Sequence, residues 1–209
     1  MLRILIADDH TVVRKGLRQI LLDEFSTAEI EEVADAEALI NKVMTAQWDV
    51  VLSDLSMPGR SGLDALQQIK LSHPNLPVLI LSIHSEEQYA LRALKAGAWG
   101  YLSKDTAPDE LVKAVQRVLL GKKYIPQEIA EKLAGSFSSD TLLLLHESLS
   151  DREFDVMKLL ANGKSVSEIA DILLLSVNTL STYRTRIMAK MNLKSNSDLT
   201  RYAIENKLI

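Results

Sequence analysis

Five short apolar runs lie in the first 120 residues, and side chains capable of chemistry follow four of them. Asp8 and Asp9 follow the first run, Asp54 the third, Ser82 the fourth and Lys104 the fifth. Carboxylates that gather in one place repel one another unless a cation lies between them. Hard oxygen ligands of this kind suit Mg²⁺, which needs only one or two carboxylates. A lysine and a hydroxyl beside them would bind an added anion, so we predict a site for magnesium and an anion.

The apolar runs cover residues 4–7, 31–34, 50–53, 78–81 and 100–102, of which the second and the fifth are weaker. Segments with helical spacing separate them, as at Leu17, Ile20 and Leu21. Apolar runs that alternate with helical patterns are typical of strands buried on both faces of a parallel sheet. We therefore predict five β-α units in an open, doubly wound α/β fold, whose working site lies at the carboxyl ends of the strands.

The composition is that of an ordinary globular protein, with 47% hydrophobic and 25% charged residues in 209. It excludes a mainly disordered chain. No stretch supplies the roughly 20 apolar residues of a membrane span, and Met1 runs straight into a strand pattern without room for a signal peptide. Without cysteine there is no disulfide framework or thiolate metal site. We expect a cytoplasmic protein with no membrane partner.

The net charge of −4 is divided unevenly along the chain. Residues 1–149 carry 15 basic and 21 acidic side chains, or −6, whereas residues 150–209 carry 9 basic and 7 acidic ones, or +2. An acidic first part and a basic last part suit two domains with different partners. The second partner would be a polyanion.

Residues 150–209 read as a series of capped helices. Ser150 and Ser165 each begin an S-x-x-E capping box, and Ser195 begins an acidic variant of it. Gly163 stands where a glycine would end the first helix, and Ser176 is a plausible N-cap. We predict an all-α bundle of four helices, three of which cover residues 151–162, 166–173 and 177–191. Residues 122–147 would be a linker, whose leucines at 142–145 form either an interdomain or dimer surface or a helix packed on its own domain.

The predicted helix 177–191 has two different faces. At 100° per residue, Leu180, Tyr183, Ile187 and Met191 share an apolar face. The opposite face is polar and has cations along its flanks; these residues are Asn178, Ser181, Thr182 and Thr185, with Arg184, Arg186 and Lys190. A helix of this kind could meet base edges with its polar face and phosphates with its cations. An ordinary solvated amphipathic helix would have the same pattern.

The segment 54–62, DLSMPGRSG, has the spacing D-x-x-M-P-x-x-x-G. Together with the acidic pair, Ser82 and Lys104, it resembles the receiver domain of two-component response regulators, over residues 1–121. The resemblance implies a flavodoxin-like sheet and a phosphoacceptor, Asp54, which would take a phosphoryl group from a phosphohistidine of a sensor histidine kinase. It also implies that Asp9, Asp54 and the Ser56 carbonyl hold Mg²⁺.

The same resemblance assigns further roles around the phosphoacceptor. Asp8 would bind Mg²⁺ largely through water, while Lys104 and Ser82 would bind the phosphoryl oxygens. Tyr101 matches the switch aromatic, which turns inward as Ser82 moves toward the phosphate. Many receivers have a cis proline after the lysine, where this chain has Asp105. A cis bond before another residue costs about 3 kcal/mol, so this loop either bears strain or is trans.

Alternatives to a receiver are weaker. A hydrolase with an aspartate nucleophile would want a second carboxylate two residues after Asp54, where Ser56 stands. His10, His73 and His84 show no ligand spacing, and we expect surface or loop roles for them.

Residues 149–153, 163–165, 168–170 and 176–181 are similar to the LuxR-type helix-turn-helix, and this resemblance covers residues 148–209. With the receiver, the chain resembles the NarL/FixJ family, and residues 179–186 are especially similar to regulators of the BvgA and EvgA kind. The resemblance implies a transcription regulator that is activated by phosphorylation and binds promoter DNA as a homodimer. An output domain that binds protein, or activity independent of phosphorylation, are the alternatives.

Two details of the helical segment bear on this resemblance. Many LuxR-type domains carry lysine and histidine where this chain has Ser181 and Tyr183, so its base preference should differ from theirs. The closing helix, with Leu199, Tyr202 and Ala203, either pairs protomers or packs internally.

Overall fold

The computed structural model describes residues 1–57, 60–83, 87–126, 129–131 and 144–209. The chain divides into two compact units, Met1–Ser139 and Asp140–Ile209. Tyr124 packs on the core of the first unit, and His146 bonds to Tyr202 in the second. The predicted linker, residues 122–147, therefore starts with residues that pack on the first unit and ends with residues that pack on the second. Its leucines at 142 and 143 lie outside the described residues.

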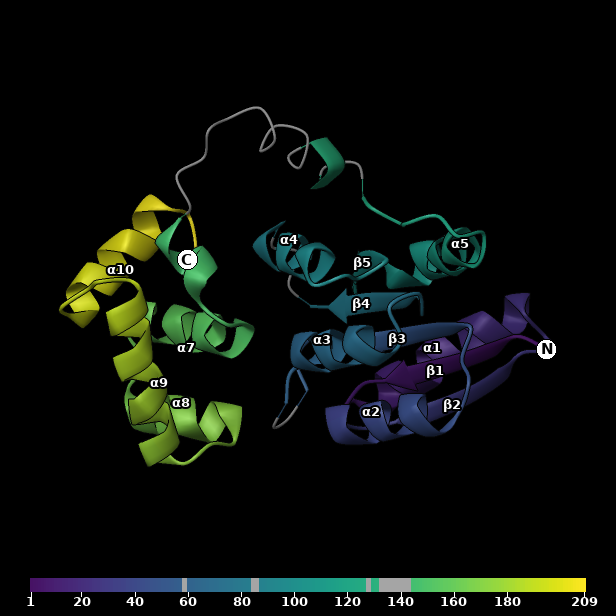
Figure 1. Cartoon of the computed structure of the whole chain (residues 1–209), viewed down its shortest axis with the longest axis horizontal. Helices are drawn as coiled ribbons and strands as arrows, with labels where there is room; N and C mark the ends of the chain where they lie inside the picture. The colour runs from purple at the N-terminus through teal and green to yellow at the C-terminus, as the bar shows by residue number, and fades with distance from the viewer. Residues whose placement is uncertain (58–59, 84–86, 127–128, 132–143) are drawn as a thin grey trace. The chain divides into compact units, whose positions relative to one another are not determined.

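Parallel strands form the sheet of the first unit, in the order β2-β1-β3-β4-β5 (Figure 1). Their bounds are β1 Arg3–Ala7, β2 Glu29–Val33, β3 Val50–Asp54, β4 Val78–Ser82 and β5 Gly100–Ser103. This confirms the predicted five-stranded parallel sheet. β2 begins two residues earlier than predicted, because it is an edge strand whose glutamates form ion pairs. Glu29 pairs with Arg3, and Glu31 with Lys42, so the strand lacks a continuous apolar run.

Helices lie on both faces of this sheet (Figure 1). They are α1 Thr11–Glu24, α2 Ala36–Thr45, α3 Gly62–Ser72, α4 Glu87–Lys95 and α5 Ala107–Leu119. The core forms where α1 and α5 pack on the strands, with Leu21 and Val115 fully buried against Ile6 and Leu52. β3 and β4 are buried along their whole length. Their ends are therefore held rigidly, which is what a site at the carboxyl edge requires.

The second unit is helical in its described part. It contains a short 3₁₀ helix, η1 Leu145–Ser148, and the helices α7 Asp151–Ala161, α8 Val166–Leu173, α9 Val177–Lys190 and α10 Asn196–Glu205. The predicted bundle of four helices is confirmed. Its N-caps are those read from the sequence, because Ser150 and Ser165 both form complete capping boxes, with Glu153 and Glu168. Gly163 follows α7 with a φ of 81°, the left-handed conformation that glycine adopts without a steric penalty.

Phe154 is the largest fully buried side chain of this bundle, and α7, which carries it, packs on both α9 and α10. Among the residues that the structure describes, no helix is both long enough and apolar enough to cross a bilayer.

Candidate functional site

The carboxyl ends of β1, β3 and β5 bring Asp8, Asp54 and Lys104 into contact. Lys104 Nζ lies 2.7 Å from Asp8 Oδ2 and 2.9 Å from Asp54 Oδ2. All three groups are withdrawn from water: the Asp8 side chain is fully buried, that of Asp54 is 2% exposed and that of Lys104 is 11% exposed. The lysine thus bridges two buried carboxylates that are 46 positions apart in the sequence, as parallel strand ends predict.

The surroundings of this contact favour the charged form of Lys104 and disfavour the charged form of Asp54. Burial raises the pKa of the Asp54 carboxyl above its ordinary value, against the opposing effect of Lys104; nearby Asp8 raises it further, and a hydrogen bond from the Ser56 backbone lowers it. Burial alone would lower the pKa of Lys104, but its contacts with Asp8 and Asp54 outweigh burial and raise it. One cation therefore faces several carboxylates.

Asp9 and His10 lie beside this contact, and with Asp8 and Asp54 they form the acidic pocket of the first unit. Asp8, Asp9, His10 and Asp54 each offer a ligand atom, and these atoms all lie within 4.8 Å of one another. Asp9 Oδ1 is buried and accepts no hydrogen bond from the residues that the structure describes, although His10 Nδ1 is 2.6 Å away. A buried carboxylate oxygen without a donor is costly unless a cation satisfies it. The donor set therefore fits a divalent cation.

Ser82 and Tyr101 lie on the neighbouring strands. Ser82 is 1% exposed at the end of β4, opposite Ser103 in the register, and its carbonyl accepts a hydrogen bond of 2.7 Å from the Lys104 backbone. The two predicted anion-binding residues are thus joined through the main chain. Tyr101 is only 2% exposed, so its ring already lies inside the unit.

The spacing of the 54–62 motif has a steric reason. A Cβ on Gly62 would lie 2.0 Å from the Asp54 carbonyl oxygen, so only glycine fits this position. The Gly62 backbone donates to the Leu55 carbonyl at 2.8 Å, which closes the loop after β3. No described peptide bond is cis, so the Lys104–Asp105 bond is trans, which is the second of the two possibilities predicted for this loop.

The polar face of α9 is exposed. Asn178, Ser181, Thr182 and Thr185 are all open to solvent, whereas Leu180, Ile187 and Met191 are fully buried. Two threonine hydroxyls of this face bond to their own helix: Thr182 Oγ1 donates to the Asn178 carbonyl and Thr185 Oγ1 to the Ser181 carbonyl, both at 3.0 Å. The helix thus separates packing residues from residues available to a ligand.

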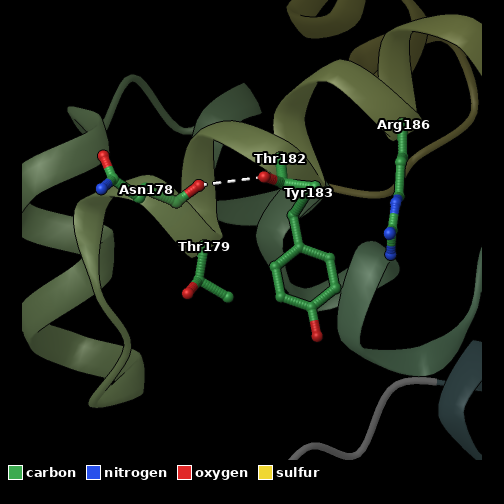
Figure 2. A pocket seen from close by; sticks show the side chains of 5 residues that line it. All are labelled: Asn178, Thr179, Thr182, Tyr183 and Arg186. Carbon is green, nitrogen blue, oxygen red and sulfur yellow. Dashed lines mark hydrogen bonds between the residues drawn. The ribbon is translucent and has the colours of Figure 1, made fainter.

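Tyr183 was predicted on the apolar face, but it is only half-buried. With Asn178, Thr179, Thr182 and Arg186 it lines a hollow of about 350 Å³. Figure 2 shows Thr179, Tyr183 and Arg186 extending from the same side of the helix. Tyrosine suits this boundary position because its ring is apolar and its hydroxyl is polar. Sequence reasoning left Thr179 and Tyr183 out of the candidate ligand face, although a spacing of four residues already places them together.

Two of the three flanking cations have partners within the second unit. Lys190 Nζ lies 2.6 Å from the buried Glu153 Oε2, and Arg184 Nε donates to Asn196 Oδ1 at 3.0 Å. Arg186 lines the hollow. These partners are 37 and 12 positions away in the sequence, so a helical wheel does not reveal them.

The closing helix packs internally at the three residues that the sequence analysis singled out. Leu199 and Ala203 are fully buried, and the Tyr202 hydroxyl lies 2.9 Å from His146 Nδ1. These three residues therefore pack internally, and the pairing of protomers by the closing helix stays a prediction. The outward side of α10 instead carries a hollow lined by Ser197, Thr200, Arg201, Ile204 and Glu205.

Two family profiles match the chain: the response regulator receiver domain over residues 4–116, and the LuxR family of bacterial regulatory proteins over residues 147–203. Response regulator UvrY of Escherichia coli strain K12 is 37% identical over 209 residues, spanning 100% of this chain and 96% of UvrY. Oxygen regulatory protein NreC of Staphylococcus carnosus is 38% identical over 215 residues, spanning 100% of this chain and 99% of NreC.

Solved structures of RcsB are also similar. RcsB from Salmonella enterica serovar Typhimurium, bound to promoter rprA in the presence of phosphomimetic BeF3⁻, aligns with a TM-score of 0.62 and 28% identity, covering 97% of this chain and 98% of RcsB. An RcsB–DNA complex aligns with a TM-score of 0.58 and 29% identity, covering 96% of each chain. The profiles, the full-length relatives and the two folds agree, so this chain belongs to the NarL/FixJ family of two-component response regulators, with a receiver domain and a LuxR-type DNA-binding domain.

Proposed function

We propose that Asp54 accepts a phosphoryl group from the phosphohistidine of a sensor histidine kinase, and that this step controls DNA binding by α9. The observation that carries the proposal is the contact of Lys104 with both Asp8 and Asp54, at 2.7 and 2.9 Å, within a buried pocket. A carboxylate oxygen of Asp54 would form the new bond to phosphorus as the bond from phosphorus to the histidine nitrogen breaks.

Each neighbour of Asp54 has a part in this step. Asp8, Asp9 and Asp54, with the Ser56 carbonyl, would hold Mg²⁺, which offsets charge on the transferring phosphoryl group when it is bound. Lys104 and Ser82 would then hold the phosphoryl oxygens. Their main-chain hydrogen bond supports a joint movement of both residues. Tyr101, already buried, would keep its ring in place as Ser82 moves.

Recognition of DNA falls to the exposed face of α9. Asn178, Ser181, Thr182 and Thr185 would meet base edges, because amide and hydroxyl groups pair with bases and threonine methyls contact thymine. The flanking cations, Arg184, Arg186 and Lys190, would meet phosphates. Arg186 should contribute most, since the other two have partners within the unit.

Phosphorylation would act by favouring a homodimer. Two copies would present their recognition helices about 34 Å apart, one turn of DNA, and the coupling between the two events would be about 1–3 kcal/mol. The RcsB structures, which include DNA complexes, a phosphomimetic and dimers, support this mechanism by analogy. The place of action would be the cytoplasm.

The first experiment incubates the full chain with acetyl phosphate and Mg²⁺, beside Asp54→Asn, and records intact mass and oligomeric state. We expect the unmutated chain alone to gain one phosphoryl group and to shift toward dimer. A gain of mass in Asp54→Asn would overturn the assignment of Asp54. A gain without a shift would leave the chemistry standing and remove the dimer from the mechanism.

The second experiment measures binding of the phosphorylated chain to promoter DNA at rising salt. Affinity should fall steeply with salt, because phosphate contacts release counterions. Arg186→Ala should weaken binding and flatten the salt dependence by about one ion. Lys113→Ala, which removes an exposed cation of α5 in the other unit, is the charge-matched control and should change neither. Indifference to salt and to Arg186→Ala would instead favour a protein partner.

A further inference from the structure

Arg14 joins α1 to the turn that follows β1. Its Nη1 donates to the Asp8 carbonyl at 2.5 Å, and its Nη2 donates to Thr11 Oγ1 at 3.2 Å. Its Nε lies 3.5 Å from Glu32 Oε2, on β2, and only 13% of the Arg14 side chain is exposed. One guanidinium group therefore contacts three parts of the chain: β2, α1 and the turn after β1.

The bond to the Asp8 carbonyl bears on the orientation of the acidic pair. This carbonyl belongs to the planar peptide unit that links Asp8 to Asp9, so fixing it restricts the ψ of Asp8 and the φ of Asp9. These two dihedral angles decide how the two carboxylates stand relative to one another. The Arg14 backbone N–H also donates to the His10 carbonyl, at 3.1 Å. Arg14 thus holds the turn at both of its ends.

This position is an unfavourable one for a cation. Arg14 is the fourth residue of α1, close to the helix N-terminus, where the helix dipole favours anions. Its Nε is buried and has no hydrogen-bond partner among the described residues. Burial of a charge costs free energy unless other contacts offset it. The contacts that offset it here are made by the guanidinium group, which indicates a role for that group rather than for its apolar stem.

We propose that Arg14 is a positioning residue of the acidic pocket. Its planar fork, which a lysine does not reproduce, fixes the Asp8–Asp9 peptide and so keeps the Asp9 carboxylate near those of Asp8 and Asp54, whose ligand atoms lie within 4.8 Å of one another. The consequence is tighter binding of Mg²⁺, because groups that orient metal ligands change metal affinity by about 10–100-fold. The proposal rests on the proposed function of this pocket as a cation site and adds the residue that orients its ligands.

The charge of Arg14 alone would act in the opposite direction. A cation beside the pocket repels Mg²⁺, so its removal would tighten Mg²⁺ binding, whereas removal of a positioning residue weakens it. Arg18 is the matched control. Its Nε lies 3.6 Å from the other oxygen of the same glutamate, Glu32 Oε1, but it makes no hydrogen bond to the turn in the part of the chain that the structure describes.

The test is a titration of the full chain with Mg²⁺ followed by amide NMR spectra, whose signal dispersion also shows whether each variant is folded. The variants are Arg14→Met, which keeps an apolar stem, Arg14→Lys, which keeps the charge without the fork, and Arg18→Met. We expect Arg14→Met to weaken Mg²⁺ binding by about tenfold or more, and Arg14→Lys by a smaller factor. Arg18→Met should stay within about twofold of the unmutated chain.

Phosphorylation by acetyl phosphate gives a second readout. The Mg²⁺ concentration that gives half of the maximal rate should rise in Arg14→Met by the same factor as the dissociation constant, and saturating Mg²⁺ should restore the maximal rate. A lower maximal rate with an unchanged half-saturating Mg²⁺ concentration would contradict the assignment, because a residue that orients metal ligands acts through the occupancy of the site.

Unchanged or tighter Mg²⁺ binding in a folded Arg14→Met would overturn the proposal, and so would an equal weakening in Arg18→Met. If Arg14→Met does not fold, Arg14→Lys decides, and an unchanged Mg²⁺ affinity in that variant overturns the role of the fork. If Mg²⁺ does not bind even the unmutated chain, the cation site itself fails, and this inference with it. If Mg²⁺ binds normally and only the effect of Arg14 is absent, the positioning role alone fails.

Discussion

The acidic pocket of the receiver domain and the exposed face of α9 use polar residues in opposite ways. In the pocket, Asp8, Asp54 and Lys104 are buried and bonded to one another across strands. On α9, Thr182 and Thr185 are exposed and their hydroxyls bond to the backbone of their own helix. Covalent chemistry on a carboxylate needs charges held in fixed places away from water. Recognition of a ligand needs exposed polar side chains that are not already bonded to other parts of the fold. Substitutions in the pocket should therefore cost stability, whereas those on the exposed face should not.

The largest expected effect is that of Lys104→Met. It leaves two buried carboxylates without their shared cation, which should lower the free energy of unfolding of the receiver domain by about 3 kcal/mol. Urea unfolding followed by tryptophan fluorescence measures this domain alone, because both tryptophans, Trp48 and Trp99, lie in it. Added Mg²⁺ should restore part of the loss. A variant as stable as the unmutated chain without Mg²⁺ would contradict the contact on which the proposed function rests.

The next effect is that of Gly62→Ala. Its Cβ would meet the Asp54 carbonyl oxygen at 2.0 Å, so the loop must shift, and we expect a loss of about 2 kcal/mol. The same unfolding experiment measures it. Gly16→Ala, in α1, is the matched control, since a Cβ there meets nothing within 4 Å and should stabilise the helix by about 0.5–1 kcal/mol. Equal effects at both glycines would show that the motif glycine has no steric role.

The smallest effect concerns Glu153, the buried charge of the DNA-binding domain. Burial raises its pKa, but hydrogen bonds from Lys190 and Ser150 outweigh burial, and the net pKa lies below its ordinary value of 4.5. Its stabilising contribution is therefore complete above about pH 4.5 and is lost as the pH falls through the folded-state pKa. Glu153→Gln should cost about 1 kcal/mol at pH 7 and remove this pH dependence.

Hydrogen exchange of the α7 and α9 amides in the full chain, measured between about pH 3 and pH 7 and corrected for intrinsic rates, checks the Glu153 prediction. Glu205→Gln, which removes an exposed carboxylate of α10, serves as control. Protection that keeps the same pH dependence in Glu153→Gln would show that the ion pair with Lys190 contributes nothing.

Sequence reasoning reached the fold and most of the pocket because parallel strands place their carboxyl ends on one edge. Asp54 and Lys104 are 50 positions apart, yet each follows a recognisable apolar run. It expected a surface or loop role for His10, which is 67% exposed, but the contact of this residue with Asp9 depends on the backbone turn after β1, which no side-chain spacing encodes. It also missed the partner of Lys190, because Glu153 lies on another helix. Periodicity shows which face of a helix is polar, but tertiary packing decides which of its charged side chains are already paired with residues on other helices.

The exposed face of α9 has an evolutionary consequence. Leu180, Ile187 and Met191 hold the helix in its domain, while Ser181, Thr182 and Thr185 contribute almost nothing to that packing. Mutations at the second set are therefore nearly neutral for folding, and natural selection can exchange them without first acquiring compensating changes in the core. Regulators that share this scaffold can diverge in the promoters they control after a gene duplication by a few substitutions on one helix face, while the receiver domain stays the same.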